Sequence, residues 1–92
     1  MSTPKFTTNE IWDDELGGLT IVVNELPLVY GEGATRFDAI SNLIDAAIEL
    51  CDVVKEKPEF CRSMNEKELV LIHILIEANS DREVIYELIY QK

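Results

Sequence analysis

The sequence predicts an α+β domain: a three- or four-stranded antiparallel sheet, in the chain order β-β-β-α-β, carries one long helix and is followed by two C-terminal helices. Three observations lead to this prediction. Residues 19–24 place aliphatic side chains at alternate positions, which is typical of a half-buried strand. Residues 36–56 instead repeat apolar side chains at helical spacing. Two further apolar segments near the C-terminus each begin at a residue that caps helices well.

A hairpin is expected at the start of the chain. Residues 6–13 are rich in β-branched and aromatic side chains, which are common in strands. Gly17 and Gly18 follow, and glycine readily adopts the positive φ angles of tight turns. Residues 19–24 then place three aliphatic side chains on one face. The two segments should therefore pair as strands, with one apolar face toward a core.

The next segment should contain the third strand and lead into the long helix. Pro27 cannot donate a hydrogen bond to a strand ladder, so it ends the second strand or marks a break. Residues 28–32 then form the third strand, which Gly33 closes. Thr35 is a good N-cap residue, and Asp38 stands three positions later, as in a relative of the capping box.

The helix over residues 36–56 is the longest predicted element. Two adjoining apolar stripes cover more than half of its circumference, so one should pack on the sheet and the other on a further helix or a second subunit. The first stripe comprises Phe37, Ile40, Ile44, Ala47, Ile48, Cys51 and Val54, and the second comprises Ala39, Leu43, Ala46, Leu50 and Val53. The remaining face is acidic, with a spacing typical of a solvated ridge rather than a site. Its residues are Asp45, Glu49, Asp52 and Glu56.

The last third of the chain should hold a short strand and two helices. Residues 59–63 are expected to form the fourth strand. Asn65 and Glu68 have the spacing of a capping box and start the next helix, which Asn79 can end in left-handed geometry. Ser80 is the expected cap of the last helix.

Length and composition predict a single domain that does not enter the membrane. The chain has 92 residues, of which 47% are hydrophobic and 28% charged, as in ordinary globular proteins. Residues 6–63 are expected to form the core of one domain spanning 1–92, and residues 64–92 a helical extension. No apolar run approaches the roughly 20 residues that cross a bilayer. Residues 1–8 lack the features of a signal peptide, so a cytoplasmic location is expected.

The charge of the chain is strongly negative. It has 18 acidic and 8 basic side chains, which give a formal net charge of -10. Contacts with phosphate need positive groups, and the sequence has no basic patch, so we do not expect the isolated chain to bind nucleic acid directly. A negative surface instead favours attraction to basic proteins, although solubility alone would account for it equally well.

The sequence contains no recognisable catalytic or metal-binding constellation. His73 is the single histidine and lies in an apolar helical segment, without an evident partner for general base catalysis. Cys51 and Cys61 do not have the spacing of zinc ligands. The acidic residues 13–15 lack the alternating pattern of a calcium loop. We therefore expect no cofactor and no enzymatic activity, and a small hydrolase using Cys61 or His73 is the weaker alternative.

One segment, residues 18–54, resembles the HicB-like antitoxin family. The shared pattern is a glycine before a strand, a Leu-Pro pair, a Gly-x-Thr turn, and an acidic residue, an alanine and an asparagine in the following helix. The matching residues are Gly18, Leu26, Pro27, Gly33, Thr35, Asp38, Ala39 and Asn42. The resemblance implies a partial ribonuclease H-like fold without the nuclease acids. It also implies that the protein binds and neutralises a small, basic toxin that cleaves messenger RNA.

Two surfaces are candidates for holding such a partner, because aromatic anchors ringed by polar groups are typical of binding hot spots. The hairpin offers Trp12, Asp13, Asp14 and Glu15, and the last helix offers Tyr86 and Tyr90, which share a face. Trp12 could equally well pack in the core. The alternative function is a structural or regulatory module without a toxin partner. Both hypotheses predict a homodimer or a higher homo-oligomer.

Overall fold

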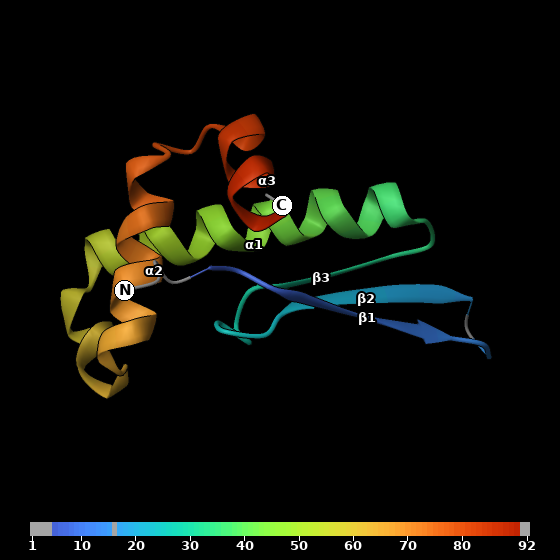
Figure 1. The fold of residues 1–92 in the computed structure, drawn as a ribbon, viewed down its shortest axis with the longest axis horizontal. Helices are drawn as coiled ribbons and strands as arrows, with labels where there is room; N and C mark the ends of the chain where they lie inside the picture. Colours follow the sequence, from blue (N-terminus) through green and yellow to red (C-terminus); the bar gives the residue numbers. More distant parts are fainter. Residues whose placement is uncertain (1–4, 16, 91–92) are drawn as a thin grey trace.

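The computed structural model describes residues 5–15 and 17–90 and has an α+β fold. Leu16, which the sequence places in the hairpin turn, and residues 1–4 and 91–92 lie outside the described residues. The elements, in chain order, are β1 (Thr8–Asp13), β2 (Gly18–Val23), β3 (Tyr30–Gly33), α1 (Arg36–Glu56), the 3-10 helix η1 (Pro58–Ser63), α2 (Glu66–Glu77) and α3 (Arg82–Tyr90). In Figure 1, α1 lies along one face of the sheet, α2 crosses one end of α1, and α3 packs near its middle.

The sheet has three antiparallel strands in the order β1-β2-β3, so β2 is central. Leu19, Ile21 and Val23 of β2 are fully buried and form the predicted apolar face. The register places Gly31 of β3 opposite Ile21 and Gly33 opposite Leu19. Opposed residues share a face, so these two glycines lie on the side of the sheet that α1 covers.

The long helix rests directly on β3 because β3 presents no side chain beneath it. A Cβ atom at Gly31 would lie 2.3 Å from the Ala39 carbonyl oxygen and 2.3 Å from the Leu43 nitrogen. A Cβ atom at Gly33 would lie 2.6 Å from the Ala39 nitrogen. Ala39 and Leu43 are themselves fully buried. The two glycines of β3 therefore set the distance between the helix and the sheet.

The start of α1 is held as the sequence predicts. The hydroxyl of Thr35 accepts a hydrogen bond from the Asp38 N–H at 3.1 Å. The side-chain amide of Asn42 donates to the Glu32 carbonyl oxygen at 2.6 Å and ties the helix to β3. Phe37 departs from the predicted apolar stripe, because its side chain is 80% exposed in the first turn of the helix.

The predicted strand at residues 59–63 is wrong. This segment belongs to the 3-10 helix η1, and the Phe60 N–H donates to the Lys57 carbonyl oxygen at 2.9 Å. The physical reason is Pro58, whose ring fixes φ near the helical value and which stands at the first turn, where its missing N–H costs nothing. The sheet therefore has three strands in the described part of the chain.

The two C-terminal helices pack on the protein's own core. Buried side chains from α2 and α3 join the same hydrophobic cluster as β2 and α1; they are Leu71, Ile72, Leu75, Ile85 and Ile89. Asn65 and Glu68 form the predicted capping box of α2. Asn79 and Ser80 both have positive φ angles, of 52° and 62°.

The predicted Ser80 cap of α3 is wrong. An N-cap residue needs extended backbone geometry, which the left-handed Ser80 does not have. Asp81 takes this role, because its carboxylate accepts hydrogen bonds from the N–H groups of Glu83, at 3.1 Å, and Val84, at 3.3 Å.

Glu25 links the segment before β1 to the turn after β2. Its carboxylate accepts a hydrogen bond from the Thr7 N–H at 2.7 Å and another from the Thr7 hydroxyl. Partial burial on its own would raise the pKa of this carboxyl, but the hydrogen bonds from Thr7 outweigh it and lower the pKa below its ordinary value of 4.5. The folded state therefore favours the charged form of Glu25.

We predict that Glu25→Gln lowers the thermal unfolding midpoint at pH 7 and that this deficit shrinks in acid. A lowered folded-state pKa stabilises the fold above the unfolded-state pKa, and that stability is lost as the pH falls through the folded value. Thermal unfolding of both proteins between pH 7 and pH 3, followed by circular dichroism, measures the difference. A deficit that stays constant over this range would contradict the prediction.

Candidate functional site

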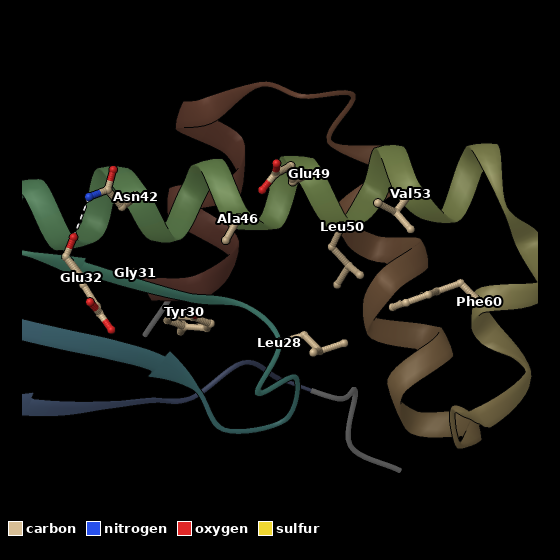
Figure 2. A pocket seen from close by; sticks show the side chains of 10 residues that line it. All are labelled: Leu28, Tyr30, Gly31, Glu32, Asn42, Ala46, Glu49, Leu50, Val53 and Phe60. Atoms are coloured by element: carbon tan, nitrogen blue, oxygen red, sulfur yellow. Dashed lines mark hydrogen bonds between the residues drawn. The ribbon is translucent and has the colours of Figure 1, made fainter.

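An open groove runs between the outer edge of β3 and one flank of α1 (Figure 2). Its volume is about 540 Å³. The residues that line it are Leu28, Tyr30, Gly31, Glu32, Asn42, Ala46, Glu49, Leu50, Val53 and Phe60. It is thus built from the third strand, the long helix, the loop after β2 and the 3-10 helix.

The apolar part of the groove lies at the end away from Asn42. Figure 2 shows Leu28, Leu50 and Phe60 pointing toward one another from three different elements. Leu50 is buried, whereas Leu28 is 61% and Phe60 39% exposed. Val53 adds a further exposed aliphatic side chain from α1. These exposed apolar side chains form a surface that a partner could cover.

The polar part of the groove is acidic. Among its lining residues, Glu32 and Glu49 carry carboxylates and none is a lysine or an arginine. Both glutamates are exposed. Glu32 lies at the Asn42 end, where the Asn42 side-chain amide donates to the Glu32 carbonyl oxygen, whereas Glu49 lies beside Leu50 (Figure 2). The groove therefore combines apolar side chains with two carboxylates and has no basic side chain in its lining.

The sequence prediction did not identify this groove, because it assigned residues 59–63 to a strand. Phe60 reaches the groove only because η1 turns back against α1, with which it is in contact. Proline at the first position of a helical turn is the signal that would have indicated this geometry.

The hairpin presents the first set of predicted binding residues at the surface. Trp12 is 57% exposed, so the alternative in which it packs in the core is wrong. Asp13, Asp14 and Glu15 are exposed beside it. The Asp13 carboxylate accepts a hydrogen bond from the Glu15 N–H at 3.0 Å and shapes the turn. The hairpin thus presents an exposed aromatic side chain next to three carboxylates.

The two tyrosines of α3 share a face, as predicted. Their ring centroids are 5.0 Å apart, and the ring planes are inclined by 32°. Tyr86 is 45% exposed, whereas Tyr90 is half-buried. Burial raises the pKa of Tyr90. The two sets of predicted binding residues come from different elements, β1 with its turn and α3.

The residues considered for catalysis lie on different helices and do not line the groove. His73 is exposed on α2, Cys51 is buried in α1, and Cys61 is half-buried in η1. None of the three lines the groove beside β3. Residues 5–15 and 17–90 contain no group of three or more His, Cys, Asp or Glu side chains arranged to hold a metal ion.

We predict that Cys61 reacts with a thiol-directed probe in the native protein much faster than Cys51. Cys51 is 4% exposed, and burial raises the pKa of its thiol, which reduces the reactive thiolate. Timed reaction with a chromogenic disulfide should show one fast thiol and a second that reacts only after unfolding. Cys61→Ser should remove the fast phase, whereas Cys51→Ser should retain it.

Comparisons with known proteins leave the family open. No protein-family model, curated protein or solved structure matches this chain. The similarity of residues 18–54 to HicB-like antitoxins therefore stays a prediction. In the described part of the chain, no helix is both long and apolar enough to cross a bilayer.

Proposed function

We propose that this chain is a binding protein that neutralises a small, basic, RNA-cleaving toxin by covering its surface. The observation that carries the proposal is the exposed Trp12 beside the carboxylates of Asp13, Asp14 and Glu15. A large aromatic side chain can anchor a partner by desolvation, and the adjacent acids would pair with its lysines and arginines. The protein acts stoichiometrically and not as an enzyme.

The charge of the whole chain supports a basic partner. A net charge of -10 on 92 residues creates a negative field that speeds association with a positive protein and excludes acidic competitors. The resemblance of residues 18–54 to HicB-like antitoxins is the reason for proposing a toxin as that partner. A cytoplasmic location belongs to the same proposal, since a messenger RNA-cleaving toxin acts there.

The test is recovery of the partner from host lysate followed by an RNA-cleavage assay. We expect a small basic protein that elutes only at high salt, and whose RNA cleavage stops when this chain is added in equimolar amount. Trp12→Ala should weaken binding by at least about tenfold, as expected for a hot-spot aromatic residue. Val70→Ala is the control, because Val70 is also an exposed apolar residue but lies on α2, outside the hairpin and α3. Recovery of this chain alone would contradict the proposal.

A second candidate is a homo-oligomeric structural or regulatory module. The specific observation that favours it is the sheet face opposite α1, which carries the half-exposed Ile11, opposite Thr20, and the half-exposed Tyr30, opposite Val22. A second copy could cover this face. Light scattering of Ile11→Lys against the wild type tests this candidate, because a dimer formed through this face should dissociate. An unchanged mass would exclude the face as the interface.

A further inference from the structure

The outer edge of β3 has backbone groups that point away from the sheet. β3 is an edge strand of the described sheet. The Val23 N–H donates to the Val29 carbonyl oxygen at 3.0 Å, which fixes the phase of the β2–β3 ladder. Antiparallel residue pairs alternate between bonded and non-bonded types. The N–H and C=O groups of Tyr30 and Glu32 therefore point outward, toward the groove.

One of the outward-pointing backbone groups on this edge already has a hydrogen-bond partner within the protein. Asn42 donates to the Glu32 carbonyl oxygen at the end of the groove where α1 comes close to β3 (Figure 2). The Tyr30 N–H and C=O and the Glu32 N–H face the wider part of the groove. There, Leu28 and Phe60 present apolar surface beside the strand edge.

A strand added at this edge would meet a different environment on each of its faces. Its residue opposite Gly31 would lie beneath α1, near Ala46 and Leu50, because opposed residues share a face. Its residues opposite Tyr30 and Glu32 would lie on the open face of the sheet, beside an aromatic ring and a carboxylate. The groove therefore fits alternating side chains: apolar toward the helix and basic toward the open face.

We propose that the groove binds an extended basic segment of a partner protein as a fourth strand of the sheet, with apolar and Lys or Arg side chains in alternation. Charge complementarity selects this occupant, because Glu32 lies on the face where the basic side chains would stand, no lysine or arginine lines the groove, and the whole chain carries a net charge of -10. Backbone hydrogen bonds to Tyr30 and Glu32 give affinity, and the alternate side chains give specificity. The inference rests on the proposed function, since it states how the basic partner is held.

The test titrates a synthetic octapeptide of alternating lysine and valine into the ¹⁵N-labelled full chain. Amide shift changes should centre on Tyr30 and Glu32, and hydrogen exchange at the Tyr30 amide should slow by about fivefold or more. Glu32→Lys should weaken binding by about fivefold, the size expected for one exposed ion pair. Glu56→Lys is the matched control, because Glu56 is an exposed residue of α1 outside the groove.

Two control peptides separate strand addition from simple charge attraction. A peptide with N-methylated lysine backbone nitrogens retains its charges but cannot pair with β3, and it should lose binding. A glutamate–valine peptide should not bind. Equal binding by either control, shift changes confined to the hairpin or α3, or no binding of the lysine–valine peptide would overturn the proposal.

The outcome is separable from that of the proposed function. A toxin that is neutralised equally well by the wild type and by Glu32→Lys would overturn strand addition and leave the antitoxin function standing. Peptide binding at Tyr30 that is weakened by Glu32→Lys, in a chain that captures no toxin, would support the binding mode and reject the antitoxin function.

Discussion

Gly31→Ala is expected to destabilise the protein by about 3 kcal/mol or more, because the added methyl group would meet backbone atoms that cannot rotate away. The Cβ would lie 2.3 Å from the Ala39 carbonyl oxygen and from the Leu43 nitrogen, and 2.8 Å from the Leu43 Cα. Relief would require α1 to move off the sheet and expose Leu43 and Ile21, which are fully buried. A domain of this size has only about 5–15 kcal/mol of stability in total, so the loss would be a large share of it.

Urea unfolding of Gly31→Ala, followed by circular dichroism, measures this loss. Gly18→Ala is the matched control, because a Cβ there would meet only the Gly33 carbonyl oxygen, at an ordinary contact distance of 3.6 Å. The control should change the free energy of unfolding by less than about 1 kcal/mol. An unfolding midpoint for Gly31→Ala equal to that of the wild type would show that α1 does not rest on β3.

Ile85→Ala is expected to cost about 3 kcal/mol, the middle of the range for truncating a buried aliphatic side chain. Ile85 is fully buried and belongs to the same hydrophobic cluster as Leu43 and Ile72. Truncation would leave a cavity between α3 and the rest of the core. The prediction tests whether the last helix covers the protein's own core or waits for a partner.

The neighbouring Val84→Ala is the control for this second prediction. Val84 lies on the same helix but is 39% exposed, so its truncation should cost less than about 1 kcal/mol. Unfolding at several protein concentrations should give the same midpoint for the wild type if the contact is within one chain. A loss for Ile85→Ala that matches the loss for Val84→Ala would mean that α3 is not packed on this core.

The two proposed binding surfaces place separate demands on a partner. The hairpin offers Trp12 among carboxylates, whereas the groove offers strand-edge backbone groups beside apolar side chains. Charge reversal at Glu32 and truncation of Trp12 therefore probe different contacts. A partner that spans both should show additive losses, since the two residues lie on opposite edge strands of the sheet.

The sequence by itself determined those features that depend on neighbours along the chain. Alternation placed Leu19, Ile21 and Val23 on the buried face of β2, and the Thr35 cap and Asn65–Glu68 capping box marked the helix starts. Such signals are local, because a cap needs only the N–H groups two or three residues later. The strand predicted at residues 59–63 was wrong because Pro58, a local signal that favours the start of a helical turn, was not taken into account.

Only the tertiary structure decided which surfaces face one another and which face solvent. The composition of the hairpin did not show whether Trp12 lies in the core or at the surface. Trp12 is exposed because it lies near the end of β1, which extends beyond α1 (Figure 1). The groove joins Leu28, Leu50 and Phe60, which no sequence spacing relates. Its shape follows from the closeness of α1 to two glycines of β3, a distance set by packing between segments that are far apart in the chain.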